Sequence, residues 1–445
     1  MAITGSIAAV KSYDATRMFQ NNGYDVQCIV SNGGERFISR LALESLSGYP
    51  VLGPDIFSFK NSEASKHENL TRENYNKKNI SEIFAHIECT KNIDAVVVLP
   101  ASANFLANFA HGCATDFLSA TILANIKPVL LCPAMNAGMW ENKVVQNNIK
   151  IIQNIYKNTT NLEIINPQQS GVLACGDVGV GKLAHLENIF LHFQKLVEKN
   201  RNENNKENTI RNKIVVINMG GTQEQIDPVR FIGNFSSGET GKIIAEQCFI
   251  LGAKKVICIV GNVNVSFKNL QEIKNFEIIK LENNSAQEML EATEKYSKNA
   301  DIVIFAAAVS DFTPKKYSQN KIKKDSNKNI CNLYTIDLSE TADIAKYISN
   351  KYINNISNNN KIFVGFALET EENSVKLKTI IQKKCESKNL DYIFGNSPKN
   401  FNQNKNSNAY NYSLYSKKTQ NFLDISKFLN ENKDVFFRKI LKSLL

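Results

Sequence analysis

The sequence predicts an α/β protein built from two doubly wound, Rossmann-like parallel-sheet domains that are joined by a polar linker. Short apolar stretches of strand length alternate with amphipathic helical stretches, a pattern typical of βαβ units in a parallel sheet covered by helices. The alternation stops at residues 200–212 and then starts again. With 445 residues, of which 43% are hydrophobic, the chain is long enough for two folded domains.

The first domain is expected to begin with a very short strand before Gly5. Longer strands and two helices follow in the order strand 25–31, strand 93–101, helix 110–125, strand 128–135 and helix 186–199. Residues 200–212 are almost all Asn, Arg, Glu and Lys, so they lack the apolar side chains needed to join a core. We therefore expect domains at 1–199 and 213–445 with a linker at 200–212.

The second domain repeats the alternation. The expected strands are residues 213–219, 255–260, 301–307 and 361–366. The expected helices are residues 239–251, 286–296 and 342–350. No internal repeat relates the two halves.

Composition excludes several classes of protein. The longest apolar stretches, residues 93–100 and 129–135, are much shorter than the roughly 20 residues that a membrane-spanning helix needs. Residues 1–10 lack the pattern of a secretion signal, so we expect a cytoplasmic protein with no membrane partner. The nine cysteines include no close Cys-x-x-Cys pair, which argues against a disulfide framework or a zinc site.

The formal net charge of +10 raises the possibility of nucleic-acid binding. However, much of the basic excess lies in Lys/Asn-rich stretches without interleaved aromatic residues or RNA-binding signatures. Anionic small molecules would use the same positive potential. We therefore expect small-molecule partners and no nucleic acid.

Two loops of the first half follow predicted strands. The run from Thr4 to Ala9 sets small residues and backbone N–H groups at a helix N-terminus, where phosphate binds well. The alternative is a tight turn with no ligand. The run from Pro100 to Asn104 lies at the carboxyl end of a buried strand, which is where doubly wound sheets bind ligands. Together the two loops favour a cofactor.

Three further residues stand out in this half. Asn136 follows a strand end, beside Met135, Met139 and the only tryptophan, and an amide there needs polar partners that a core position rarely offers. Cys175 lies in a glycine-rich loop; it is either an inert thiol or a proton donor. His86 precedes a strand, where a surface or core role is the alternative to a catalytic one.

Taken in order, five motifs resemble the homo-oligomeric flavin-containing cysteine decarboxylases, and phosphopantothenoylcysteine decarboxylases in particular. They are Gly-Ser-Ile-Ala-Ala, His-Ile-Glu, Pro-Ala-x-x-Asn, Pro-Ala-Met-Asn-x-x-Met-Trp-Glu-Asn and Ala-Cys-Gly-Asp-x-Gly-x-Gly. The resemblance implies a homo-oligomer that binds FMN through Gly5, Ser6, Ile7, Ala8, Ser31, Ala101 and Asn104. It also implies substrate contacts at Met135 and Met139.

The resemblance assigns chemistry to three side chains. Loss of carbon dioxide from a cysteinyl carboxylate would leave an unstabilised carbanion, and a transient oxidation of the thiol by the flavin avoids this. Asn136 would hold the substrate carboxylate, His86 would act as the base, and Cys175 would donate the final proton.

The second half has its own loops at strand ends. Gly220-Gly221-Thr222 ends a strand, and residues 227–238 lead through Ser-Ser-Gly into a helix, either as simple capping or as an anion cradle. Asp311 follows the strand that contains Ala306 and Ala307. The lysine run 321–324 is either a solvated charge run or a partner for a triphosphate.

These motifs resemble phosphopantothenate–cysteine ligase domains, and the order of the two halves resembles that of bacterial bifunctional coenzyme A biosynthesis enzymes. The resemblance implies Mg²⁺ and a CTP co-substrate, with the metal at Asp311. Asn234 would stabilise or turn over an acyl-cytidylate, and Lys321 would stabilise charge while it forms. The implied nucleotide contacts are Ala306, Ala307, Asp311, Lys321, Asp343, Ile344, Phe366, Lys384 and Lys388.

The chain departs from these families in three places. Almost nothing precedes Gly5, residues 339–344 lack a usual lysine and proline, and residues 220–224 lack a usual proline. Two other functions remain as alternatives. A non-enzymatic flavoprotein regulator is opposed by the intact set of His86, Asn136 and Cys175. A nicotinamide-dependent dehydrogenase is opposed by the lack of a strand-linked Gly-x-Gly-x-x-Gly motif.

Overall fold

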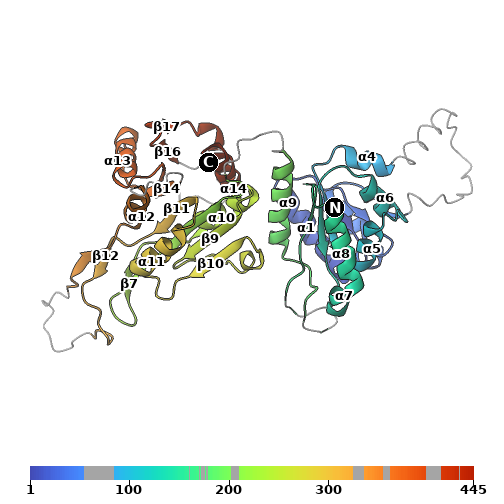
Figure 1. Ribbon diagram of the computed structural model, residues 1–445, viewed down its shortest axis with the longest axis horizontal. Coiled ribbons are helices and arrows are strands. Elements are labelled where there is room, and N and C mark those ends of the chain that lie inside the picture. Colours follow the sequence, from blue (N-terminus) through green and yellow to red (C-terminus); the bar gives the residue numbers. More distant parts are fainter. Residues whose placement is uncertain are drawn as a thin grey trace, which may run out of the picture. The chain divides into compact units, whose positions relative to one another are not determined.

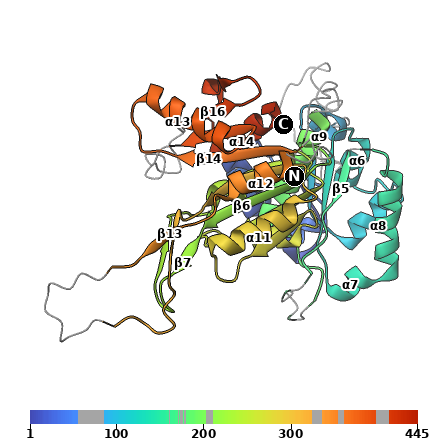
Figure 2. The same ribbon diagram turned by 60° about the vertical axis from the view of Figure 1, so that its left-hand side comes forward.

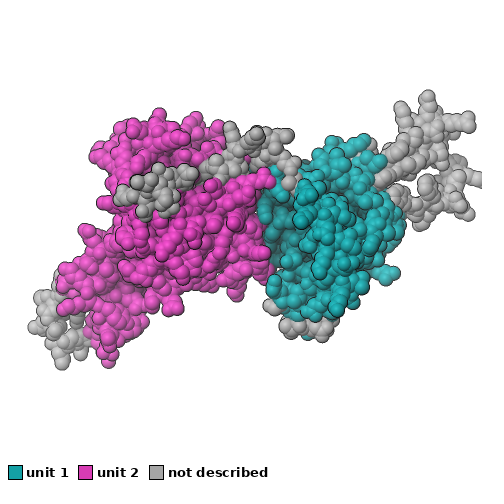
Figure 3. Space-filling model, in the orientation of Figure 1, with its two compact units in different colours: residues 1–204 teal, residues 205–445 magenta. Residues whose placement is uncertain are grey.

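The computed structural model describes residues 1–54, 85–159, 161–169, 171, 176, 179–201, 210–323, 335–353, 361–396, 412–429 and 431–444. The chain divides into two compact units, Met1–Asn204 and Asn205–Leu445 (Figure 3). This division falls inside the expected linker, of which residues 202–209 lie outside the described ranges. None of the helices in those ranges combines the length and apolarity that a membrane span requires.

Unit 1, the part of the chain coloured from blue to green in Figure 1, contains one parallel sheet of five strands in the order β2-β1-β3-β4-β5. Its strands are β1 (Ala2–Ile3), β2 (Ile29–Val30), β3 (Val96–Ala101), β4 (Val129–Pro133) and β5 (Leu162–Ile164). The chain reverses its direction of winding between β1 and β3, which defines a doubly wound sheet. The predicted fold class is therefore confirmed in this half.

Helices cover both faces of this sheet. They are η1 (Ile7–Val10), α1 (Lys11–Asn21), η2 (Gly34–Arg36), α2 (Arg40–Ser47), α4 (Ala85–Lys91), α5 (Ala103–Ala110), α6 (Phe117–Ala124), α7 (Ala137–Glu141), α8 (Lys143–Ile155) and α9 (Leu186–Arg201). Helices α1 and α9 pack on one face, and α5, α6 and α8 pack on the other. Successive strand side chains point to opposite faces, so each strand contributes to both cores.

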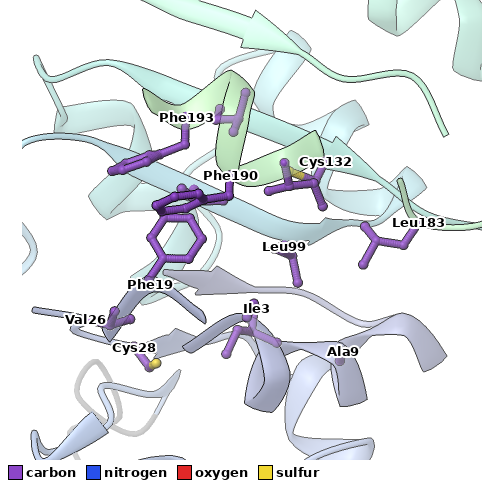
Figure 4. Close-up of a cluster of buried hydrophobic side chains, with 14 of the residues drawn as sticks. Ile3, Ala9, Phe19, Val26, Cys28, Leu99, Cys132, Leu183, Phe190 and Phe193 are labelled. Carbon is purple, nitrogen blue, oxygen red and sulfur yellow. The ribbon is translucent and has the colours of Figure 1, made fainter. Parts of the chain in front are cut away.

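The core under α1 and α9 is rich in aromatic side chains. Phe19 of α1 meets Phe190 and Phe193 of α9 edge to face, with ring centroids 5.1 and 4.8 Å apart (Figure 4). Ile3 and Leu99 reach the same cluster from β1 and β3. Although β1 has only two residues, both of them are buried, and the strand lies inside the sheet between β2 and β3.

Two predictions for unit 1 are wrong in extent. The single helix expected at 110–125 is instead the end of α5 followed by α6, because Gly112 with φ +67° follows α5 and Asp116 starts α6. Asp116 accepts the Ser119 N–H at 2.7 Å, and the Ser119 hydroxyl accepts the Asp116 N–H at 2.9 Å, which forms a capping box. The strand expected at 25–31 is reduced to β2.

Unit 2 contains an eight-stranded sheet in the order β10-β9-β6-β11-β14-β15-β16-β17. Its strands are β6 (Ile214–Gly221), β9 (Lys255–Val260), β10 (Phe276–Lys280), β11 (Ile302–Ala308), β14 (Ile362–Leu368), β15 (Tyr392–Asn396), β16 (Ser413–Ser416) and β17 (Asn421–Leu423). The strands from β10 to β15 are parallel and doubly wound, as predicted, with the change of direction between β6 and β11. The antiparallel additions β16 and β17 were not predicted.

The helices of unit 2 are α10 (Glu239–Ile250), η4 (Leu270–Glu272), α11 (Ala286–Ser297), α12 (Ile344–Ile353), α13 (Ser374–Ser387), η7 (Ser426–Phe428) and α14 (Lys433–Leu444). Helices α11, α12 and α13 share one core cluster with the strands. Helix α10 lies against β6, where Gly241 leaves room for Met219. Helix α14 places Phe437 on Phe394 of β15, with ring centroids 5.8 Å apart.

Two small antiparallel sheets extend from the main sheet of unit 2 (Figure 2). One pairs β7 (Gln223–Gln225) with β8 (Phe231–Gly233), and the other pairs β12 (Phe312–Pro314) with β13 (Leu338–Glu340). Both begin immediately after the switch-point strands, because β7 follows β6 and β12 follows β11. They therefore bring residues from distant parts of the sequence to the carboxyl end of the sheet.

Candidate active sites

In unit 1, Thr4 joins the carboxyl ends of β1 and β3. Its hydroxyl donates to the Pro100 carbonyl at 2.6 Å and accepts the Ser102 N–H at 2.8 Å. Gly5 follows directly, and a Cβ atom there would lie 3.0 Å from the Gly33 backbone, so glycine permits the close approach of two loops. Thr4 thus joins the loops that follow β1 and β3, which is the point where doubly wound sheets bind ligands.

A cavity of about 810 Å³ opens at this point. Its volume is within the usual range for cofactor and substrate pockets. Seven of the residues named from the sequence line it, namely Gly5, Ser6, Ile7, Ala8, Met135, Asn136 and Met139. The structure thus brings together two motifs that are about 130 residues apart in the chain.

The local hydrogen bonds explain how Ser6 and Asn136 are held. The Ser6 hydroxyl accepts the Ala8 N–H at 3.4 Å and starts η1. Asn136 starts α7, and its Oδ1 accepts the Gly138 N–H at 2.8 Å. Both are polar residues that favour helix N-termini, so each loop turns into a helix beside the cavity.

The opposite wall is a returning segment that follows the glycine-rich motif. The Met135 N–H donates to the Gly181 carbonyl at 2.9 Å, and Gly181 has φ +123°. A Cβ atom on Gly181 would lie 2.3 Å from the Met135 carbonyl oxygen, so this position requires glycine. The Gln168 side-chain amide donates to the Leu183 carbonyl at 2.7 Å and also fixes this segment.

Several polar cavity residues were missed by the sequence analysis: Lys11, Asp14, Gln168, Lys182, His185 and Glu187. Ser102, which also lines the cavity, lies in the run from Pro100 to Asn104 that was expected to face a ligand. A signal existed for some of the missed residues, because Lys11 and Asp14 occupy the first turn of the helix that follows the phosphate-type loop. Lys182 likewise follows the Gly-x-Gly motif directly. Gln168 carries no such signal, since its position depends on tertiary pairing with residues 182 and 183.

Three other named residues of unit 1, Ser31, Ala101 and Asn104, are not among the residues that line the cavity. The Ser31 hydroxyl accepts the Gly34 N–H at 3.1 Å, Ala101 is fully buried, and Asn104 is exposed on α5. His86 belongs to α4, although its side chain is not described. Cys175 lies outside the described residues. The roles given to these residues stay predictions.

In unit 2, Asn234 lies at the carboxyl ends of β6 and β11. A Cβ atom on Gly221 would lie 2.7 Å from the Asn234 carbonyl oxygen, so glycine allows this approach. The Asn234 amide donates to the Val309 carbonyl at 2.8 Å, and the Thr222 hydroxyl accepts the Ser310 N–H at 2.8 Å. The chain that leads from β11 to Asp311 is therefore held by two side chains from the β6 side.

The segment with Ala306, Ala307 and Asp311 is held from two other directions. Asn218, buried on β6, accepts the Ala307 N–H on its Oδ1 at 3.2 Å. The Asp311 carbonyl accepts the Thr341 N–H at 3.0 Å. Asp311 itself is exposed. Among the described residues, no group of three or more His, Cys, Asp or Glu side chains is arranged to hold a metal ion.

The remaining named residues of unit 2 make contacts within the protein. Lys388 lies 3.0 Å from the Asp343 carboxylate, and Lys384 lies 2.5 Å from Glu369, just beyond β14. The Phe366 ring stacks on Phe394 with centroids 4.8 Å apart. The Ile344 side chain is buried in the core under α12, so only its backbone is available to a ligand. Lys321 lies in the chain between β12 and β13.

Comparison with known proteins assigns the chain to a family. The flavoprotein family model matches residues 1–198, and the model of the DNA/pantothenate metabolism flavoprotein C-terminal domain matches residues 210–444. The coenzyme A biosynthesis bifunctional protein CoaBC of Bacillus subtilis is 35% identical over 401 residues, which cover 90% of this chain and 85% of that protein. The protein of the same name from Vibrio vulnificus is 29% identical over 444 residues, covering 100% and 96% of the two chains.

A solved structure of the C-terminal domain of a coenzyme A biosynthesis bifunctional protein covers 53% of this chain and 95% of its own, with 29% identity and a TM-score of 0.39. The full-length relatives and the two family models together settle the membership. The chain belongs to the family of bifunctional coenzyme A biosynthesis enzymes, with a flavoprotein decarboxylase domain followed by a phosphopantothenate–cysteine ligase domain.

Proposed function

We propose that the cavity of unit 1 binds FMN and carries the decarboxylation of 4'-phosphopantothenoylcysteine to 4'-phosphopantetheine. The observation that carries this proposal is the meeting of residues 5–8 with Met135, Asn136 and Met139 around one cavity. FMN fits these residues, because small residues at a helix start suit its phosphate. The apolar side chains of Ile7, Met135 and Met139 suit its ring system.

Bound FMN supplies a reversible oxidation of the thiol side of the substrate. Asn136, whose Oδ1 is bonded to Gly138, directs its amide group to hold the substrate carboxylate. His86 acts as the base that removes a proton from the substrate, and Cys175 returns a proton to the product carbon. Cys132 in β4 has no such role, since it is buried in the core and burial raises the pKa of its thiol, which makes it a weaker acid.

In unit 2 we propose a CTP-dependent ligation that precedes the decarboxylation. The carboxylate of 4'-phosphopantothenate attacks the α-phosphorus of CTP and releases pyrophosphate; the amine of cysteine then attacks the acyl-cytidylate and releases CMP. Asp311 would hold the Mg²⁺ that accompanies the triphosphate, and the metal would offset part of its charge. Asn234 contacts the acyl group, and Lys321 stabilises the charge that develops as the acyl-cytidylate forms. The switch-point location of Asn234 supports this assignment.

The nucleotide is proposed to lie along Ala306, Ala307 and Asp311, with its base near Phe366. Lys384 and Lys388 compensate for the lysine that residues 339–344 lack, since each charge-assisted contact contributes roughly 1.5–3 kcal/mol. Both lysines face carboxylates, Glu369 and Asp343. Binding of the triphosphate therefore has to exchange these ion pairs for phosphate contacts.

We also propose a functional division of the chain: the decarboxylase at 1–199, a linker at 200–212 and the ligase at 213–445. A cytoplasmic homo-oligomer is proposed as well. Large exposed apolar side chains around the small sheets of unit 2, including Phe231, Phe235 and Phe312, support self-association.

The test supplies the purified full chain with 4'-phosphopantothenate, cysteine, CTP and Mg²⁺. We expect 4'-phosphopantetheine, with one carbon dioxide and one pyrophosphate per turnover. Cys175→Ser is the matched control: it should release pyrophosphate normally but at most one carbon dioxide per flavin, because the flavin is left reduced, and it should fail to complete 4'-phosphopantetheine. An equal response to ATP would contradict the nucleotide assignment, and a normal yield from Cys175→Ser would contradict the role of the thiol.

A further inference from the structure

Asp227 is the centre of a tight turn between β7 and β8. The Asp227 Oδ1 accepts the N–H groups of Val229 and Arg230, both at 2.9 Å. The Ile226 N–H donates to the Arg230 carbonyl at 2.9 Å and closes the turn. The Asp227 carboxylate is buried, and its ion pair with Arg230 holds its pKa well below the ordinary range. The turn therefore carries a permanent buried charge that is fully hydrogen-bonded.

The same carboxylate reaches a segment 95 residues further along the chain. The Asp227 Oδ2 accepts the Ile322 N–H at 3.1 Å, and Arg230 Nη2 donates to the Ile322 carbonyl at 2.8 Å. Both polar groups of the Ile322 peptide backbone are thus bonded to one ion pair. A further contact nearby, from the Ser318 N–H to the Ile226 carbonyl at 3.0 Å, joins the two segments again.

Ile322 is the neighbour of Lys321, the residue proposed to stabilise charge during acyl-cytidylate formation. The side chain of Ile322 is 40% exposed, so packing contributes little to the position of this segment. The backbone bonds to the ion pair are the contacts that fix where the lysine side chain begins. Arg230 donates from both Nε and Nη2 to the Oδ2 of the buried Asp227, and two such donors hold the pair more rigidly than a single surface contact would.

We propose that Asp227 is a positioning residue of the ligase reaction: through Arg230 and the backbone of Ile322 it holds Lys321 in place for acyl-cytidylate formation. This inference rests on the proposed function of unit 2. It makes the turn between β7 and β8 part of the lysine's support, although Lys321 itself lies in the chain between β12 and β13. Residues 227–238 then have two roles: they connect β7 and β8 to the start of α10, and Asp227 within them positions Lys321.

The first test measures hydrogen exchange of peptides that contain Ile322 in the full-length protein, without any substrate. Asp227→Asn removes the charge and weakens the acceptor, so exchange at Ile322 should accelerate about tenfold, the effect of losing one charge-assisted bond. Asp391→Asn is the matched control, because Asp391 accepts the Phe363 N–H at 2.8 Å at the far end of the sheet. Unchanged exchange at Ile322 in Asp227→Asn would overturn the proposal.

The second test is a double-mutant cycle on pyrophosphate release with 4'-phosphopantothenate and CTP. If Asp227 acts through the lysine, Asp227→Asn should lower turnover roughly tenfold in the wild type and less than twofold in Lys321→Gln. Arg230→Gln, at an exposed side chain, should behave in the same way and serves if Asp227→Asn does not fold. Equal losses in both backgrounds would overturn the positioning role.

The two failures are distinguishable. A wild type that releases no pyrophosphate contradicts the proposed function of unit 2. An active wild type in which the Asp227 and Lys321 losses multiply contradicts only the inference about Asp227. Asp391→Asn should give the same small loss, if any, in both backgrounds.

Discussion

The two units use the same type of switch point in different ways. In unit 1 the loops after β1 and β3 enclose a cavity of about 810 Å³ with largely apolar walls. In unit 2 the loops after β6 and β11 are bonded to one another, through Asn234 to Val309 and Thr222 to Ser310. Two of the lysines that are proposed to bind CTP, Lys384 and Lys388, already contact carboxylates.

This difference follows the chemistry proposed for each unit. A resident cofactor needs a space that exists before it binds, and rigid glycine contacts such as that of Gly181 maintain one. A triphosphate that is consumed in every cycle has to be released as products. Lysines paired with carboxylates keep their positions while no nucleotide is bound and exchange partners when it arrives. Three substitutions test this contrast between the sites, and a fourth tests the stability of unit 2 alone.

The largest expected effect is that of Asn136→Asp in unit 1. Aspartate also caps helices, so the bond from the Gly138 N–H should survive and only the charge should change. Two carboxylates in contact repel each other by several kcal/mol, so carbon dioxide release should fall at least about a hundredfold. Pyrophosphate release should not change. The measurement is carbon dioxide release from 4'-phosphopantothenoylcysteine.

The control for this variant is Asn142→Asp. Asn142 caps α8 by accepting the Val144 N–H at 2.9 Å, but it does not line the cavity. Its substitution introduces the same charge at the same kind of helix start. Equal losses in the two variants would contradict the role of Asn136 as the carboxylate clamp.

The second effect is that of Gly181→Ala, which tests whether the cavity is rigid. The added methyl group would clash with the Met135 carbonyl in a backbone conformation that L-residues avoid. Flavin occupancy of the purified protein, read from its absorbance, should fall roughly tenfold as the wall moves by one carbon diameter. Gly23→Ala is the control, since Gly23 has φ +82° and open space around it. Full flavin occupancy in Gly181→Ala would show that the backbone around residue 181 shifts to accept the methyl group, and that the cavity wall is not rigid.

Buried parallel strands were the features most accessible from the sequence. The strand β9 was predicted at its observed limits, and β6 and β11 within two residues, because such strands are continuous apolar runs that end at polar residues. The antiparallel strands β16 and β17 were missed. They are short and lie at the edge of the sheet, where the apolar signal is weak.

The candidate sites divide in the same way. Gly5 and Asn136 were predictable because residues that follow parallel strands gather at one edge of the sheet. Asn234 follows the antiparallel strand β8 and was named only through the resemblance of its motif to a known family. Gln168 was not, since it depends on the return of the chain along Met135. The contact of Asp227 with Ile322 joins segments 95 residues apart, and no local pattern marks it. Tertiary hydrogen bonds of this kind have no sequence period.

The third effect is a gain of affinity in unit 2 from Glu369→Gln. The neutral amide no longer competes for Lys384, so the Kd for CTP should fall about three- to fivefold, within the range of a partly exposed ion pair. Glu294→Gln is the control, because it releases Lys351 on the face covered by α11 and α12. A weaker affinity in Glu369→Gln would mean that the glutamate positions Lys384, and the exchange of partners would be wrong.

The smallest expected effect on either reaction is that of Glu246→Gln, which should leave both turnovers unchanged and alter only the stability of unit 2. Burial raises the pKa of Glu246 on α10 to about 7, while Lys242 opposes the shift and Asp434 adds to it. Between about pH 4.5 and 7 the folded state therefore keeps a proton that the unfolded state loses, so the wild type loses stability as the pH rises through this window.

Glutamine carries no such proton. The variant should match the wild type near pH 4.5 and exceed it by on the order of 2 kcal/mol above pH 7.5. Hydrogen exchange of α10 in urea measures this difference. The fluorescence of Trp140, the only tryptophan of the chain, follows unit 1 in the same samples and should not respond. Glu291→Gln, at an exposed position on α11, is the control substitution. If the difference in stability between wild type and Glu246→Gln did not depend on pH, Glu246 would stay charged beside Lys242, and the raised pKa on which this prediction rests would be wrong.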